Sequence, residues 1–162
     1  MNIRIPDIEN KVLFLGNLMT MKPRTLYLIK RAEIETTSRM VKALGKYGLT
    51  PIQFTVLYFV NDDPADLSSA QLSRRFSMTP QSMNELVAVL EKKKLLKKTT
   101  DQSHKRILRI SLTAKGKKVL ADCNGVMDSL EYTLLKSLSP AETNTLRNLI
   151  GKILASSKET GI

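Results

Sequence analysis

Residues 68–94 read SSAQLSRRFSMTPQSMNELVAVLEKKK, and this stretch decides the fold. Ser68 begins an S-x-x-Q pattern, which is the spacing of an N-terminal capping box. Thr79 is followed directly by proline, so a capping hydroxyl precedes a residue that suits the first helical position. These two start signals predict a short helix over 69–76, a tight turn, and a longer helix over 80–94.

The longer helix has two different faces. Apolar side chains recur at i, i+3, i+4 and i+7, which predicts one buried stripe. The stripe consists of Met83, Leu86, Val87 and Leu90. Four polar side chains near the start of the helix fall on other faces and are free to contact a partner: Gln81, Ser82, Asn84 and Glu85.

A β-hairpin is expected to follow this helix. Leu108, Ile110 and Leu112 alternate with more polar neighbours, which is the period of a strand with one buried face. We therefore expect strands over 95–99 and 106–112, joined by a polar turn. The order helix, turn, helix, hairpin is that of the winged helix-turn-helix.

The excess positive charge of the chain coincides with this module. Residues 71–118 contain thirteen basic and three acidic residues, a balance of +10 against +11 for the whole chain. A basic block within an ordered, apolar-patterned segment favours a surface that meets phosphates. The alternative is a solvated charged face that aids solubility.

Duplex DNA suits this module because the major groove admits one α-helix, whose first residues reach the base edges. The wing can reach the neighbouring minor groove, where arginine is favoured, and Arg106 is the candidate there. We expect DNA contacts from Arg74, Arg75, Thr79, Gln81, Ser82, Asn84, Glu85, Lys105 and Arg106. The alternative for each is an ordinary exposed side chain.

The flanking segments predict further helices, so the fold class is mostly α with a small β-hairpin wing. The expected helices cover 8–19, 23–46, 51–61, 114–138 and 140–156. We expect residues 1–49 and 114–162 to be dimerisation helices around a DNA-binding domain of residues 50–113. Apolar side chains that would find partners across a two-fold axis are Leu26, Ile29, Leu120, Leu130, Leu134, Leu146, Ile150 and Ile153.

Composition argues against several other classes of protein. The chain contains no run of eighteen apolar residues, so no membrane span is predicted. Its start lacks the pattern of a secretory leader, so we expect a cytoplasmic protein. One cysteine and one histidine leave no multi-cysteine zinc site and no catalytic triad, so we expect neither a metal nor an enzyme. Cys123 is expected to be a small buried hydrophobe rather than a redox sensor.

Three stretches resemble the MarR family of bacterial transcriptional regulators. Residues 48–57, GLTPIQFTVL, are similar to the family's "GLTxxQ(W/F)xVL", and residues 90–96, LEKKKLL, are similar to "LExKGLI". Residues 101–116 resemble its wing and exit, "DPxDRRxxxVxLTxKG". The resemblance implies a homodimer that binds palindromic operator DNA, usually as a repressor. It often also implies an aromatic or phenolic ligand that weakens DNA binding, with no other cofactor.

The chain departs from the family pattern at three positions. Lys94 stands where the family usually has the glycine that ends the recognition helix, and lysine there needs a left-handed conformation or a different helix end. His104 replaces a wing acid that usually orients the arginine two positions later. Glu85 occupies a position that is often polar or basic, where a carboxylate can accept from a cytosine amino group.

An effector pocket and two rival functions remain as alternatives. Four side chains could line a pocket between the dimerisation helices and the DNA-binding lobe, or could be plain core: Tyr27, Met40, Phe54 and Tyr58. One rival function is a sequence-indifferent, basic architectural DNA-binding protein, which would have no preferred site over bulk DNA. The other is a protein–protein adaptor, for which an acidic or apolar recognition helix is expected.

Overall fold

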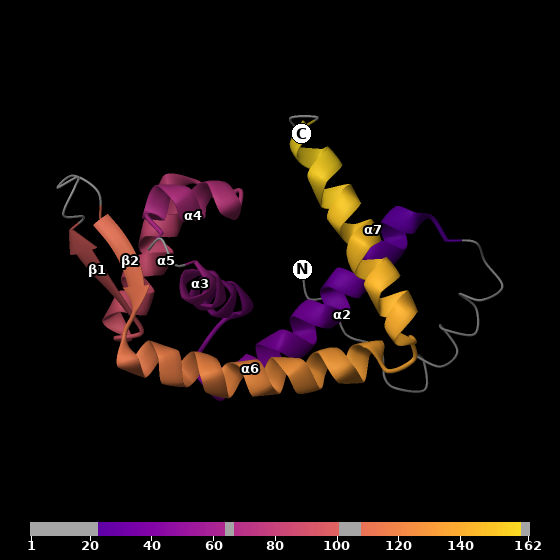
Figure 1. Cartoon of the computed structure of the whole chain (residues 1–162), viewed down its shortest axis with the longest axis horizontal. Helices are drawn as coiled ribbons and strands as arrows, with labels where there is room; N and C mark the ends of the chain where they lie inside the picture. Colours follow the sequence, from indigo (N-terminus) through magenta and orange to yellow (C-terminus); the bar gives the residue numbers. More distant parts are fainter. Residues whose placement is uncertain (1–22, 64–66, 101–107, 160–162) are drawn as a thin grey trace, which may run out of the picture. The chain divides into compact units, whose positions relative to one another are not determined.

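The computed structural model describes residues 23–63, 67–100 and 108–159 (Figure 1). The chain divides into two compact units, residues 1–39 and residues 40–162. Within the described part, no helix combines the length and the apolarity that are needed to cross a membrane. The same part contains no cluster of three His, Cys, Asp or Glu side chains that could hold a metal ion.

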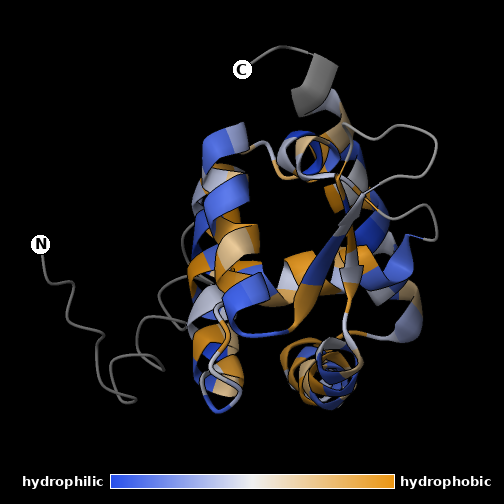
Figure 2. Ribbon diagram, turned by 90° about the vertical axis from the view of Figure 1, so that its left-hand side faces the viewer, coloured by the Kyte–Doolittle hydropathy of each residue, from blue (hydrophilic) through white to orange (hydrophobic). Residues whose placement is uncertain are grey.

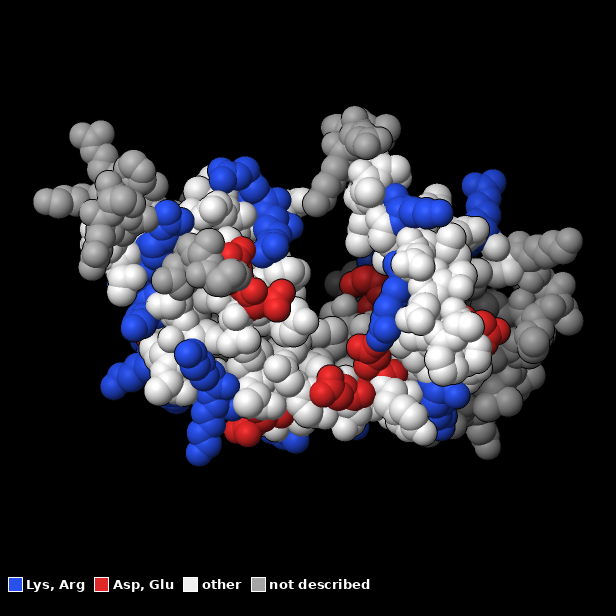
Figure 3. Space-filling view, in the orientation of Figure 1, with Lys and Arg blue, Asp and Glu red and all other residues white. Residues whose placement is uncertain are grey.

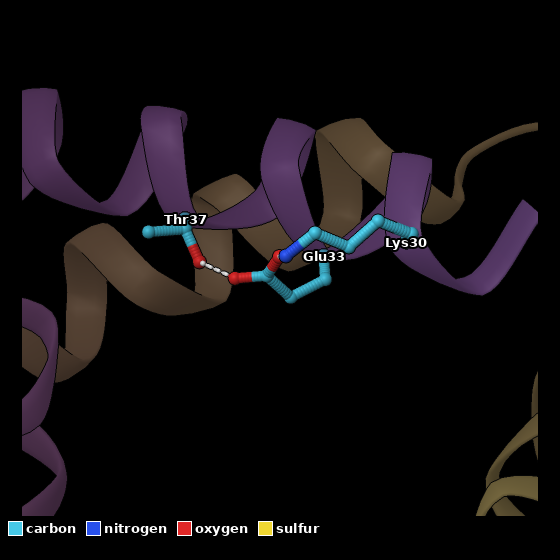
Figure 4. Close-up of polar contacts among 3 residues, drawn as sticks. All are labelled: Lys30, Glu33 and Thr37. Atoms are coloured by element: carbon cyan, nitrogen blue, oxygen red, sulfur yellow. Dashed lines mark hydrogen bonds and ion pairs between the residues drawn. The ribbon is translucent and has the colours of Figure 1, made fainter. Parts of the chain in front are cut away.

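Helix α2, Thr25–Gly45, confirms the predicted long helix and runs from the first unit into the second. Within the first unit it carries a polar ladder. Glu33 accepts hydrogen bonds from Lys30 Nζ at 2.9 Å and from Thr37 Oγ1 at 3.2 Å (Figure 4). The hydrogen bond from Lys30 is the main reason that the pKa of Glu33 is lowered. Side chains at this spacing lie one turn apart on the helix surface, and such exposed contacts stabilise the helix only slightly.

The second unit holds the predicted helix-turn-helix. Its first helices are α3 (Pro51–Asp62), α4 (Ser69–Arg75) and α5 (Pro80–Lys92). The capping boxes form as their sequences predict, with Gln53 N bonded to Thr50 Oγ1 and Gln71 N bonded to Ser68 Oγ, both at 3.3 Å. Caps of this kind satisfy N–H groups that the first helical turn leaves unpaired.

The wing follows α5. Strand β1, Leu96–Thr100, pairs antiparallel with β2, Leu108–Leu112, in a register that sets Leu96 opposite Leu112. Leu96, Ile110 and Leu112 are buried, which confirms the alternation seen in the sequence. The predicted turn residues 101–107 lie outside the described part. Within this unit, Figure 1 shows the hairpin next to α5, with α6 leading away from the end of β2.

Two long helices complete the chain. Helix α6 spans Ala114–Leu135 and α7 spans Pro140–Glu159. Thr113 caps α6 as predicted, because its Oγ1 accepts from Gly116 N at 2.9 Å. Helix α6 ends three residues before the predicted residue 138. The chain leaves the helix before Ser139, because this residue already belongs to the start of α7. Its N–H group donates to Glu142 Oε2 at 2.8 Å. This backbone hydrogen bond lowers the pKa of Glu142.

One hydrophobic core holds the second unit together. Its residues come from the end of α2, from α3, α4 and α5, from both strands and from α6. Figure 2 shows that hydrophilic and hydrophobic residues follow one another along the helices. Its largest fully buried side chains are Leu44, Leu57, Leu72, Met83, Leu90 and Ile110. Leu120 corrects a prediction, because it is buried in the core of its own chain and is not available to a partner subunit.

Cys123 lies in this core. Its side chain is fully buried, which confirms the expected small hydrophobe. Burial raises the pKa of the Cys123 thiol, the neighbouring Asp122 raises it further, and Lys46 partly offsets both. The thiolate is the reactive form of cysteine, so this environment suits packing rather than redox chemistry.

Candidate nucleic-acid interface

A tight turn sets α5 against α4. Ser77 has φ 51°, a left-handed conformation that no sequence signal at this serine indicated. Met78 N donates to Ser73 O at 2.9 Å, and Ser77 N donates to Arg74 O at 3.3 Å. These bonds satisfy the last carbonyls of α4 while the chain reverses. The end of α4 and the start of α5 are thereby held side by side.

Helix α5 shows the two faces that its sequence predicts. Thr79 caps it, with Ser82 N donating to Thr79 Oγ1 at 3.1 Å. Met83, Val87 and Leu90 are fully buried, and Leu86 is partly buried beside them. The four predicted contact residues of the first turns are all exposed: Gln81, Ser82, Asn84 and Glu85.

The two amides on this face differ in their surroundings. Gln81 Nε2 donates to Glu85 Oε1 at 3.2 Å, so part of its hydrogen-bonding capacity is engaged within the helix. Within the described residues, the side-chain amide of Asn84 makes no hydrogen bond. A side-chain amide can pair bidentately with adenine through its carbonyl and amino groups. Asn84 is therefore the amide that is fully available to a base.

The two arginines at the end of α4 also differ. Arg75 Nη1 lies 3.6 Å from Asp63 Oδ2, and its guanidinium lies 4.6 Å from the centroid of the Phe59 ring. Arg74 is exposed and makes no ion pair within the described residues. An Arg75 held by a carboxylate and an aromatic face has less freedom to reach a phosphate. Arg74 is the better placed of the two predicted phosphate contacts.

On the wing, Lys98 Nζ lies 2.7 Å from Glu91 Oε2 and is neutralised by it, whereas Lys97 is exposed. Lys105 and Arg106, the predicted contacts of the wing turn, lie outside the described residues. The minor-groove contact of Arg106, and the effect of His104 on it, therefore stay predictions.

The cations surround α5 rather than covering its first turns. Lys and Arg side chains lie over α4, over the wing and around the start of α6 (Figure 3). Six of the lysines are exposed near the far end of α5: Lys92, Lys94, Lys97, Lys115, Lys117 and Lys118. Because α5 is about 20 Å long, they lie well away from the amides of its first turns. Arg74, at the turn before α5, is the exposed cation near these amides, so a group that can read a base and a group that can hold a phosphate are both present there.

At the end of α5, Lys94 adopts the first of the two alternatives that the sequence left open. This lysine has φ 60°, so it adopts the left-handed conformation that a glycine would take at less cost. The same turn contains a contact that the sequence did not predict. Lys93 Nζ donates to Gly48 O at 2.5 Å and to Gln53 Oε1 at 2.9 Å. Its partners are 45 and 40 residues away, and no local signal in the sequence connects them.

A hollow of about 350 Å³ lies between α3 and α6. It is lined by Phe54, Thr55, Tyr58, Asn124, Met127, Asp128 and Glu131. Two of the four predicted ligand-binding residues, Phe54 and Tyr58, are among them. Met40 instead packs against the hydrophobic core, and Tyr27 lies in the first unit.

Comparison with known proteins finds the same module elsewhere. The model of the MarR family matches residues 47–107. The HTH-type transcriptional repressor Rv2887 of Mycobacterium tuberculosis is 28% identical over 127 residues, which is 78% of this chain and 91% of that protein.

Solved structures show the same fold. MepR of S. aureus, in a complex with DNA, superposes with a TM-score of 0.75 at 24% identity, covering 83% of this chain and 99% of MepR. MarR of E. coli in its apo form superposes with a TM-score of 0.69 at 22% identity, covering 83% of this chain and 99% of MarR. At these identities the likeness establishes the winged-helix fold.

Proposed function

This chain belongs to the MarR family, and from that premise we propose that it is a transcriptional repressor that binds a palindromic DNA operator as a homodimer. The observation that carries the proposal is the exposed start of α5. Asn84 and its polar neighbours face outward there, while Met83 and Val87 anchor the opposite face in the core. A capped helix presented in this way can enter the major groove with its first turns.

Exposed apolar side chains support a homodimer. On α7, Leu149, Ile150, Ile153 and Leu154 are all about half exposed or more, between 47% and 60%. Leu26 and Ile29 of α2, two of the predicted partner residues, are also exposed. A single soluble chain seldom leaves this much apolar helix surface in water, and a second copy is the commonest way to cover it.

The chemistry of α5 argues against a sequence-indifferent architectural protein. Such a protein would bind almost entirely through cations on phosphates. Here the first turns of α5 carry two amides, a hydroxyl and a carboxylate, and Glu85 would repel phosphate. A protein–protein adaptor is disfavoured by the same polar, hydrogen-bonding face.

Operator symmetry tests the proposal. Two α5 helices related by a two-fold axis are expected to protect half-sites about 10 base pairs apart, or a multiple of that, centre to centre. The protein should first be used to select duplexes from a randomised pool, and the selected duplex should then be footprinted. Light scattering at micromolar concentration should give the mass of a dimer. A single half-site without symmetry, or a folded monomer, would contradict the proposal of a homodimer.

We propose that a small-molecule effector binds in the hollow between α3 and α6. Its volume of about 350 Å³ is that of a small-molecule site. Tyr58, Asp128 and Glu131 are among the residues that line it. Arg147 is paired with Glu131 through Nη2, whereas Asp128 has no ion pair within the described residues. A hollow lined by an aromatic ring and by a carboxylate without an ion pair among the described residues favours an aromatic cation over a phenolate.

Binding of two simple probes tests this effector site. Benzyltrimethylammonium should bind the protein, as measured by calorimetry, and benzoate should bind more weakly. Asp128→Asn is expected to weaken binding of the cation about fivefold, since it removes one partly exposed carboxylate. Asp122→Asn removes an exposed carboxylate from the same helix outside the hollow and should leave binding unchanged. A preference for benzoate would show that an aromatic cation is the wrong class of ligand.

A further inference from the structure

Lys93 is the C-cap residue of α5, and its side chain reaches into another part of the fold. Its ammonium bonds to Gly48 O, in the loop before α3, and to the side-chain carbonyl of Gln53 in the first turn of α3. Within the described residues, these are the hydrogen bonds that join the end of α5 to α3 and the loop before it. The side chain therefore links two elements that are far apart in the sequence.

The acceptors on the α3 side are held firmly in place. Gln53 is only 8% exposed, and its Oε1 also accepts from Thr50 N at 3.3 Å as part of the capping box. The two lone pairs of that carbonyl are thus both in use. Gly48 follows α2 with φ 63°, and Leu49 beside it is buried in the core. The ammonium is therefore bonded to the capped first turn of α3 and to the loop residue Gly48 shortly before it.

The backbone at the end of α5 is fixed from the other side by α6. Lys115 Nζ donates to Lys93 O at 3.1 Å. Thr113 Oγ1, at the start of α6, donates to Lys94 O at 2.7 Å. The end of α5 is therefore held between the first turns of α3 and α6, while its opposite end is the one that faces DNA.

Helix α5 packs on the core along its length, and the hydrogen bonds at its end help to fix its tilt. Over the roughly 20 Å length of α5, a tilt of about 3° moves the far end by about 1 Å. Hydrogen bonds to base edges weaken over such distances, and a bidentate amide–base pair requires both of its bonds at once. Phosphate contacts made by long, mobile lysines tolerate the same displacement. Loosening the held end should therefore reduce discrimination between sequences more than overall affinity.

We propose that Lys93 is a positioning residue that fixes the orientation of α5 for sequence reading, and that it is not a phosphate contact. The proposal rests on the proposed DNA-binding function. Its neighbour Lys92 provides the contrast, since it is exposed on the last turn of α5 and has no hydrogen-bond or ion-pair partner within the described residues. The two lysines carry the same charge at adjacent positions, and only Lys93 joins α5 to α3.

The test compares Lys93→Met with Lys92→Met in the full-length protein. The probes are the duplex that the wild-type protein selects from a randomised pool and a scrambled duplex of the same composition. Lys93→Met is expected to lower the ratio of the two affinities about tenfold, with a salt dependence like that of wild type. Lys92→Met should leave the ratio unchanged. Lys93→Arg keeps a cation that can donate to both acceptors, so it should retain most of the discrimination.

Gln53→Met gives an independent arm on the α3 side, because it removes one acceptor without changing any charge. It should lower the same ratio, and combining it with Lys93→Met should add little further loss, since both variants break one link. Gln53→Met also tests the proposal if Lys93→Met does not fold. A thermal melt would show whether Lys93→Met is folded.

Two results would overturn the proposal in different ways. If Lys93→Met weakens both duplexes equally and lowers the salt slope by about one, Lys93 is a phosphate contact and the positioning role is wrong. If the wild-type protein itself shows no preference between the two duplexes, the proposed operator-binding function fails, and the role of Lys93 in reading fails with it.

Discussion

Gly116→Ala is expected to lower the free energy of unfolding by about 3 kcal/mol. A Cβ at Gly116 would lie 2.0 Å from Leu95 O and 3.0 Å from Leu95 C, which are backbone atoms. That backbone cannot retreat easily, because Leu95 O accepts from Thr113 N at 3.0 Å and Leu95 N donates to Leu90 O at 3.0 Å. Any relief must move α6 away from the end of α5.

Gly125→Ala is the matched control in the same helix. A Cβ there would have no atom within 4 Å. Alanine loses less conformational freedom than glycine on folding, so this variant should raise the free energy of unfolding by about 0.5–1 kcal/mol. Urea denaturation of both variants measures the two changes with opposite sign. If Gly116→Ala were as stable as wild type, the close packing of α6 on residue 95 would be incorrect.

Asn84→Ala is expected to lose about 1–3 kcal/mol of binding free energy on the selected operator and little on scrambled DNA. The Asn84 amide is exposed in the first turns of α5, with no side-chain hydrogen bond among the described residues to give up. Each bidentate contact between an amide and adenine discriminates against the other base pairs. Removing it therefore removes specificity while the cations that hold phosphate remain.

Arg74→Ala is the companion variant for this experiment. Arg74 is exposed at the end of α4, and as a phosphate contact it should weaken binding to both duplexes and lower the salt slope by about one. Both variants should be titrated against operator and scrambled duplexes at several salt concentrations. Equal losses for Asn84→Ala on the two duplexes would mean that α5 positions the protein and that the bases are read elsewhere.

The helices and their starting points could be predicted from the sequence because their signals are local. Thr50, Ser68, Thr79 and Thr113 each cap a helix with a hydroxyl that bonds a backbone N–H three residues later. Such a bond forms within one turn and needs no other part of the chain. For Lys94 the sequence left two possibilities, a left-handed conformation or a different helix end, and the structure shows the left-handed conformation.

The exposed face of α5 was also determined by the sequence. The positions of Met83, Val87 and Leu90 determine which side of the helix is buried. Asn84 lies on another side, so it is exposed whichever residues make up the rest of the core. The identity of the core partners was not determined in this way. Leu120 has the same apolar spacing as a dimerisation residue, and only the tertiary structure shows that its own chain covers it.

Only the tertiary structure decided which charged residues are free. Arg74 and Arg75 are adjacent and equivalent in the sequence, yet Arg75 is held by Asp63 and Phe59. Lys92 and Lys93 are equally alike, and only Lys93 bonds to Gly48 and Gln53. Caps and helical faces depend on residues within one or two turns, which the sequence supplies directly. The partner of a long charged side chain depends on how distant segments of the chain pack together. The residues next to that side chain in the sequence do not determine this packing.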